Sequence, residues 1–173
     1  MKKYSIITAG MLLLAVASCR LDTFMYRPFQ IEEYELDDYF SDDETFFVLD
    51  ASYDIPENLI HLFSLGSGPT DNRETIHAVY IGDRARIAQD TVIVYCHGNS
   101  GNMDWYWQRA KLLANVGGKN RYGVLMMDYR GYGKSTGNST EEGLYYDVDA
   151  CVNLLIEQGL TSERTVIYGF SLG

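Results

Sequence analysis

The sequence has little positive charge, no cluster of metal-ligating side chains and no apolar run long enough to cross a membrane. Its 14 Lys and Arg residues stand against 24 Asp and Glu residues, which gives a net charge of −10. Nucleic-acid binding needs a basic face, so this balance argues against nucleic acid as a partner. The 3 His and 3 Cys residues lack the spacing of metal ligands, so we expect no metal and no other cofactor.

Internal repeats and low-complexity segments are also missing. The hydrophobic content of 46% and the charged content of 22% are ordinary for a globular protein, which excludes a mainly disordered or collagen-like chain. A length of 173 residues allows one domain with a substantial core.

The first nineteen residues have the pattern of an export signal. A basic start precedes an apolar run from Ile6 to Ala17, which is shorter than the roughly 20 residues that a spanning helix needs. The run closes with Val-Ala-Ser-Cys at residues 16–19, which resembles the lipobox of bacterial lipoproteins. By that resemblance residues 1–18 are a signal peptide, Cys19 is lipidated, and the protein is exported and anchored to a membrane of the cell envelope. The alternatives are an ordinary secretory signal or an uncleaved anchor with an incidental Cys.

The segment that follows, residues 19–57, is strongly acidic. From Ile31 to Glu44, eight of the fourteen side chains are acidic. A run of like charge is usually a solvated face, so we interpret residues 19–57 as an acidic tether and lead-in to the folded domain. A more specific role, such as holding the domain off an anionic membrane or docking a basic partner, is the alternative.

From residue 58 onward, extended and helical patterns alternate. The first two expected strands are joined by a turn-rich segment and predict a hairpin, and the later apolar runs predict strands buried in a parallel sheet. The expected strands are residues 58–65, 74–81, 91–96, 124–128 and 164–170, and the expected helices are 104–116 and about 140–158. This alternation predicts an α/β sheet built with right-handed crossovers.

Local patterns add detail to the two helices. Ser139 and Glu142 have the spacing of a capping box at the start of the second helix. Periodicity predicts a buried stripe on each helix. The stripes are Trp105, Leu112, Leu113 and Val116 on the first helix, and Leu144, Val148, Cys151, Val152 and Leu155 on the second.

Two cysteines lie in the expected domain. Cys96 ends a predicted strand and Cys151 lies on the apolar face of a predicted helix, so we expect two buried free thiols. A disulfide between them is the alternative outside the cytoplasm.

The clearest chemical motif is Gly169-x-Ser171-x-Gly173, directly after an apolar strand. A nucleophile elbow needs a strand that runs into a tight turn and lifts the Ser hydroxyl above the sheet edge. The two Gly positions allow the close backbone approach of such a turn. Ser171 is therefore the candidate nucleophile.

The turn formed by His97, Gly98 and Asn99 follows another buried strand. A turn of small residues at a strand end can direct a backbone N–H at a reacting carbonyl oxygen. We expect the N–H groups of Asn99 and Leu172 to form an oxyanion hole. His97 is interpreted as structural, with a role as catalytic base as the alternative.

The Gly-rich segment 128–135 fails the spacing of both nucleotide-binding motifs. Asp128 occupies the position of the first Gly of a Walker A motif, and Thr136 that of the third Gly of a dinucleotide fingerprint. Nucleotide binding is thereby excluded.

The segments 95–102, 128–135 and 169–173 together resemble the α/β-hydrolase superfamily, in its branch of esterases, lysophospholipases and serine-aminopeptidase-like proteins. The resemblance covers residues 58–173. It implies Ser171 as nucleophile, Leu172 N–H as one oxyanion donor, and the turn with Gly98 and Asn99 as the binding wall opposite. It also implies that residues 128–135 form a structural loop beside the site.

In this superfamily the triad runs Ser, then Asp or Glu, then His along the chain. Nothing follows Gly173 in this sequence. We therefore expect the N-terminal part of an α/β-hydrolase fold, cut short after the nucleophile strand, whose apolar last strand is an open edge. The complete protein would hydrolyse small-molecule carboxylic esters through an acyl-Ser171 intermediate, and this fragment would be inactive. A non-catalytic, membrane-tethered binding or remnant domain is the alternative.

Overall fold

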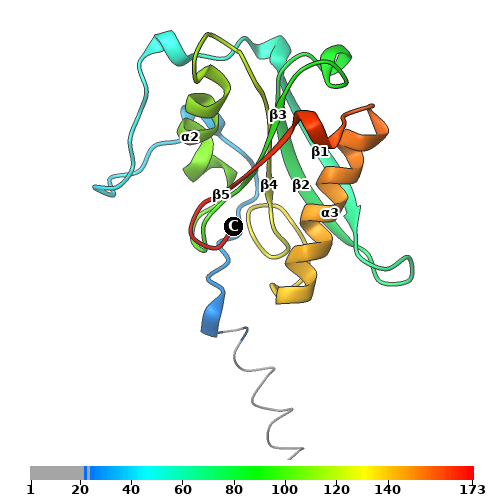
Figure 1. Ribbon diagram of the computed structural model, residues 1–173. Helices are drawn as coiled ribbons and strands as arrows, with labels where there is room; N and C mark the ends of the chain where they lie inside the picture. Colours follow the sequence, from blue (N-terminus) through cyan, green and yellow to red (C-terminus); the bar gives the residue numbers. More distant parts are fainter. Residues whose placement is uncertain (1–21, 23) are drawn as a thin grey trace, which may run out of the picture.

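The computed structural model describes residue 22 and residues 24–173, which form a five-stranded sheet with a helix on each face (Figure 1). The strands lie in the order β1-β2-β4-β3-β5. Their bounds are β1 Ile60–Ser67, β2 Glu74–Ile81, β3 Val92–Cys96, β4 Gly123–Asp128 and β5 Thr165–Gly169. The expected hairpin is present, since β1 and β2 pair antiparallel, and β1 starts at Ile60 because a short 3-10 helix occupies Glu57–Leu59.

The sheet is mixed, with a parallel half that carries the motifs. β2 pairs antiparallel with β4, whereas β3 pairs parallel with both β4 and β5. The carboxyl ends of β3, β4 and β5 therefore meet at one edge of the sheet, and the three sequence motifs follow these ends. The α/β sheet expected from the sequence is confirmed.

Helix α2, Met103–Asn115, covers one face of the sheet. The side chain of Asn102 caps it by accepting hydrogen bonds from the N–H groups of Asp104 and Trp105. The expected buried stripe on this helix is only partly correct, because Trp105 and Leu113 pack against the core but Val116 is 49% exposed and ends the helix. The face against the sheet is instead Met103, Trp107, Ala110 and Ala114, where two small Ala side chains let the helix approach the strands closely.

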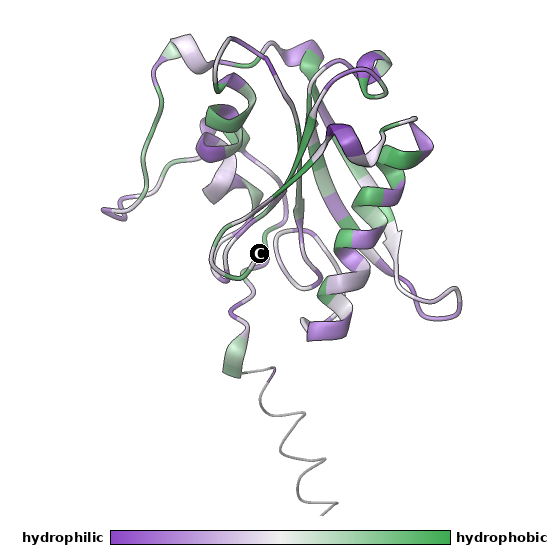
Figure 2. Ribbon diagram, viewed as in Figure 1, coloured by the Kyte–Doolittle hydropathy of each residue, from purple (hydrophilic) through white to green (hydrophobic). Residues whose placement is uncertain are grey.

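Helix α3, Glu141–Glu157, covers the opposite face, and its expected stripe is confirmed. The predicted capping box at its start is wrong. Thr140 is the cap, because its hydroxyl accepts from Gly143 N–H, while Ser139 Oγ donates to the carbonyl of Arg130. Figure 2 shows that hydrophobic residues gather in the central strands and on the α3 face toward them.

The core is therefore divided by the sheet into two layers. β3 and β4 are buried along their whole length, as expected for central strands. Cys96 and Cys151 are both buried and both free, which confirms the expectation of two free thiols.

The acidic lead-in segment packs on the domain around a 3-10 helix, η1, Leu36–Asp38. Asp104 Oδ1 accepts hydrogen bonds from the N–H groups of Glu35 and Leu36 at 3.0 and 2.8 Å. Lys111 Nζ on α2, almost fully buried, lies 2.5 Å from Asp37 Oδ1. Composition alone does not show these contacts, which fix this part of the segment to α2.

Two expectations concern the membrane. The signal peptide, residues 1–18, and the lipidation residue Cys19 lie outside the described residues. Within the described part of the chain, no helix has the length and apolar character needed to cross a membrane.

Candidate active site

Residues 169–173 form a tight turn after β5, at the carboxyl edge of the parallel strands. Ser171 has a φ of 59°, in the left-handed region that few non-glycine residues adopt. The turn is closed by Gly173 N–H, which donates to Phe170 O at 3.3 Å, and is tied to β3 by Phe170 N–H, which donates to Cys96 O at 3.0 Å. The hydroxyl of Ser171 is thereby presented on an exposed, strained turn.

Both glycines of the motif lie where a side chain has no room. A Cβ on Gly169 would collide with the backbone carbonyl of Gly173, and a Cβ on Gly173 would collide with the carbonyl of Cys96. Backbone atoms cannot move aside as a flexible side chain can. The Gly-x-Ser-x-Gly spacing therefore follows from the closeness of the turn to β3.

The turn after β3 lies directly against this elbow. A Cβ on Gly98 would stand 2.5 Å from Tyr106 Oη and 3.2 Å from the ring of Phe170. The N–H groups of Asn99 and Leu172, the expected oxyanion donors, donate to no other group within the described residues. An oxyanion hole needs two donors directed at one oxygen atom, so both N–H groups stay candidates for that role.

The Asn99 side chain is held in place by three partners. Its Nδ2 donates to Met25 O at 2.6 Å, and its Oδ1 accepts from Tyr132 Oη at 2.8 Å and from Arg27 N–H at 3.2 Å. The start of the described chain therefore braces the turn that carries the candidate oxyanion donor.

His97 is fully buried beneath the turn. Its Nδ1 lies 2.8 Å from Gly98 O, and its Nε2 lies 3.1 Å from Asp128 Oδ1, in a contact that falls outside hydrogen-bond geometry. The ring also stacks on Tyr106, with centroids 5.0 Å apart. Both ring nitrogens thus face structural neighbours, which agrees with the structural interpretation of this residue.

The loop after β4 is organised around Asp128, which is fully buried. Tyr34 Oη donates to its Oδ2 at 2.7 Å, and burial together with this carboxylate raises the pKa of Tyr34. Gly133 has a φ of 53°, and a Cβ there would collide with the Asp128 carboxylate. Ser135 Oγ donates to Asp128 O at 2.7 Å. The Asp-x-x-x-x-Gly spacing of the loop is therefore a folding requirement.

A buried ion pair that the sequence analysis missed joins this loop to α3. The Arg130 guanidinium donates to Asp147 Oδ1 through Nε and through Nη2, the latter at 2.9 Å. The backbone N–H of Arg130 donates to Asp147 Oδ2 at 2.8 Å. Ser67 Oγ at the end of β1 donates to Asp147 Oδ1 at 2.6 Å. Asp147 lies between Leu144 and Val148 in the apolar stripe of α3, and a carboxylate at such a position is the sequence signal that indicates a buried ion pair.

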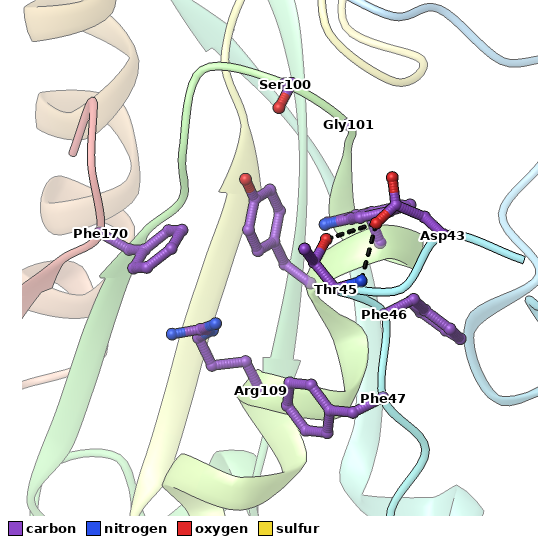
Figure 3. Close-up of a pocket in the computed structure, with 10 residues that line it drawn as sticks. Asp43, Thr45, Phe46, Phe47, Ser100, Gly101, Arg109 and Phe170 are labelled. Carbon is purple, nitrogen blue, oxygen red and sulfur yellow. Dashed lines mark hydrogen bonds between the residues drawn. The ribbon is translucent and has the colours of Figure 1, made fainter. Parts of the chain in front are cut away.

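A cavity of about 480 Å³ opens beside the elbow (Figure 3). It lies between α2, the turn after β3 and the lead-in segment. Its walls are mainly aromatic, with one guanidinium group, that of Arg109. The lining residues are Asp43, Thr45, Phe46, Phe47, Ser100, Gly101, Trp105, Tyr106, Arg109 and Phe170. A second cavity, of about 360 Å³, lies against Cys96, Leu172 and Gly173.

The described residues contain the candidate nucleophile and the candidate oxyanion donors, and place no base beside them. None of their His or carboxylate groups forms a hydrogen bond with the Ser171 hydroxyl. The other two His residues lie on the hairpin, where His61 Nε2 contacts Gly82 O and His77 Nδ1 contacts Ser64 Oγ. In this part of the chain no group of three metal-ligating side chains comes together.

A family model described as the α/β-hydrolase fold matches residues 91–173. The chain is 34% identical over 82 residues to YfhR of Escherichia coli K12, an uncharacterized protein, and 37% identical over 82 residues to bem46 of Schizosaccharomyces pombe. Each alignment covers 47% of this chain but only 28% and 26% of the two relatives. The chain thus spans about a quarter of the length of these curated relatives.

Among solved structures, the chain is similar to the esterase Pf2001 of Pyrococcus furiosus, with a TM-score of 0.55 and 21% identity. The superposition covers 86% of this chain and 48% of that one. At this identity the likeness shows the fold and nothing more. Residues 91–173 match the model of the α/β-hydrolase fold, and the five-stranded sheet has the architecture of the N-terminal part of that fold.

Proposed function

We propose that the chain is the N-terminal part of a serine hydrolase that cleaves carboxylic esters through an acyl intermediate on Ser171. The observation that carries the proposal is the strained φ of 59° at Ser171, on a turn packed against a second turn with a free N–H. Backbone strain of this kind persists where the surrounding structure imposes it, and it is concentrated at active sites.

The chemistry needs two groups that the described residues do not supply, a His and its acidic partner. Ser171 Oγ attacks the ester carbonyl, and its proton passes to a His, which then protonates the departing alcohol. Water hydrolyses the acyl-enzyme by the same route in reverse, and the N–H groups of Asn99 and Leu172 stabilise each oxyanion. Without the His and its acidic partner, the hydroxyl is a weak nucleophile, so the 173-residue chain alone is inactive.

The proposal also includes the localisation of the protein. A signal peptide ending at residue 18 and a lipid on Cys19 would anchor the hydrolase to a membrane of the cell envelope. Metabolic labelling with a palmitate analogue tests this part. We expect the label on the wild-type protein and none on the Cys19→Ser variant.

A fluorophosphonate probe tests the nucleophile, since it reacts covalently with activated Ser hydroxyls. The protein isolated from its native source should be labelled on Ser171, as mapped by mass spectrometry. Ser171→Ala should abolish the labelling, while Ser64→Ala, a matched change on the exposed strand β1, should leave it intact. Labelling that persists in Ser171→Ala would contradict the proposed nucleophile.

A further inference from the structure

The cavity beside Phe170 has a cation among aromatic walls. We infer that it binds an apolar or aromatic group that ends in a carboxylate, with the Arg109 guanidinium as the partner of that carboxylate. The inference deepens the proposed function, because it assigns an anionic ester as the substrate class. Binding of such a carboxylate is measured without catalysis, so it is tested separately from the proposed hydrolysis.

Arg109 is the only cationic side chain that lines this cavity. It projects from α2, with its guanidinium carbon 4.1 Å from the centroid of the Phe170 ring (Figure 3). Its buried Nε has no hydrogen-bond acceptor within the described part of the chain, and none of the carboxylates described lies within ion-pair distance. The other guanidinium N–H groups of Arg109 also have no acceptor among the described residues, and these can bind a carboxylate in the cavity.

Aromatic side chains form most of the remaining wall. Phe46 and Trp105 pack together, with centroids 5.5 Å apart, and Tyr106 packs on Phe170 at 6.0 Å. Gly101 has a φ of 81° and leaves Trp105 room to lie against the turn, since a Cβ there would be 2.9 Å from its side chain. These rings offer apolar area to a ligand of about the cavity's size.

One negative side chain, Asp43, also borders the cavity. It is exposed, and its Oδ1 already accepts hydrogen bonds from Thr45 N–H and Oγ1 at 2.8 and 2.6 Å. Water screens an exposed charge far more than a half-buried one. Arg109 therefore dominates the electrostatic field on its own side of the cavity. Burial raises the pKa of the Tyr106 hydroxyl there, and the positive charge of Arg109 acts against that rise.

The cavity borders the two turns that carry the proposed reaction centre. Phe170 immediately precedes Ser171, and Ser100 immediately follows Asn99, so two lining residues flank the nucleophile and the oxyanion donor. A carboxylate on Arg109 would hold one end of an ester while its carbonyl reaches Ser171.

Calorimetric titration of the whole protein with 4-phenylbutanoate and with its neutral amide tests the inference. The carboxylate should bind about tenfold more tightly than the amide, as a charge-assisted hydrogen bond predicts. Arg109→Gln should abolish that preference. Arg84→Gln is the matched control, because Arg84 also stacks on a Phe ring, at 5.0 Å from Phe63, but lies outside the cavity.

Arg109→Lys provides a second test if Arg109→Gln does not fold, because it keeps the positive charge but loses the planar group that binds a carboxylate through two hydrogen bonds, and it should weaken the preference. Ser171→Ala should retain it, so a failure of the proposed nucleophile is distinguished from a failure of this inference. Equal affinity for acid and amide, absence of binding, or a preference that persists in Arg109→Gln would overturn the inference.

Discussion

At the scale of single residues, the elbow depends on the missing Cβ atoms of Gly169 and Gly173. The hydrogen atoms in their place let the turn approach β3 closely enough for Phe170 N–H to reach Cys96 O at 3.0 Å. The strained φ of Ser171 is maintained by this approach. The geometry of the candidate nucleophile is therefore fixed by its two Gly neighbours.

Gly169→Ala should lower the free energy of unfolding by about 1–3 kcal/mol, because its Cβ collides with the backbone of Gly173. Urea unfolding followed by circular dichroism measures the change. Gly66→Ala in β1 is the control, since its Cβ would meet only the flexible side chain of Arg73, at 3.2 Å. Equal stability of the two variants would contradict the steric explanation.

Asp147 is the residue on which three elements converge, and its fully buried carboxylate pairs with Arg130, whose side chain is 12% exposed. Asp147→Asn leaves that guanidinium without its partner and should cost about 3 kcal/mol of stability. Asp149→Asn, an exposed change on the same helix, should cost almost nothing. The same unfolding experiment compares them, and similar losses for both would show that the ion pair is unimportant.

At the scale of elements, the lead-in segment and α2 are joined through Asp104. Burial raises the pKa of this carboxyl above its ordinary 3.8, although the N–H groups of Leu36 and Glu35 oppose the rise. The folded state therefore holds the proton to higher pH than the unfolded chain does. The contribution of Asp104 to stability falls as the pH rises from 3.8 through the folded-state pKa.

Asp104→Asn removes this ionisation and retains an oxygen that can accept from Glu35 and Leu36 N–H. The variant should gain stability relative to the wild type as the pH is raised from acidic to neutral. Chemical unfolding of both proteins over that range measures the difference. A difference that is constant with pH would show that Asp104 does not titrate differently in the two states.

Strand β5 is an apolar edge, paired only with β3 among the described residues. Val166 is 45% exposed and Ile167 is 57% exposed. Unpaired backbone groups beside apolar side chains promote association between chains. Ile167→Lys should therefore reduce self-association of the 173-residue chain in sedimentation experiments. Ile156→Lys, an equally exposed change on α3, should not.

At the scale of the whole molecule, periodicity predicted the order of the strands and helices well. The runs at 91–96 and 124–128 are strongly apolar because both strands are buried on both sides, and this made them easy to recognise. The stripe on α2 was partly mispredicted because its sheet face uses Ala110 and Ala114, and leaves Val116 outside. Helical spacing alone does not distinguish a small buried side chain from an exposed one.

In the candidate site, the local features could be predicted from the sequence and the long-range features could not. Ser171 and the turn with Asn99 could be predicted, because a strand end and a Gly-rich turn are local patterns. The cavity could not, because Phe47, Arg109 and Phe170 come from three distant segments that only folding brings together. Sequence spacing likewise gives no indication that Lys111 of α2 is paired with Asp37 of the lead-in segment.

The most direct measurement is fluorophosphonate labelling of two polypeptides, the protein from its native source and the 173-residue chain produced alone. We expect stoichiometric labelling of Ser171 in the native protein, and no more labelling of the 173-residue chain than of its Ser171→Ala variant. Absence of any Ser171 labelling in the native protein would contradict the assignment of Ser171 as the nucleophile of a hydrolase.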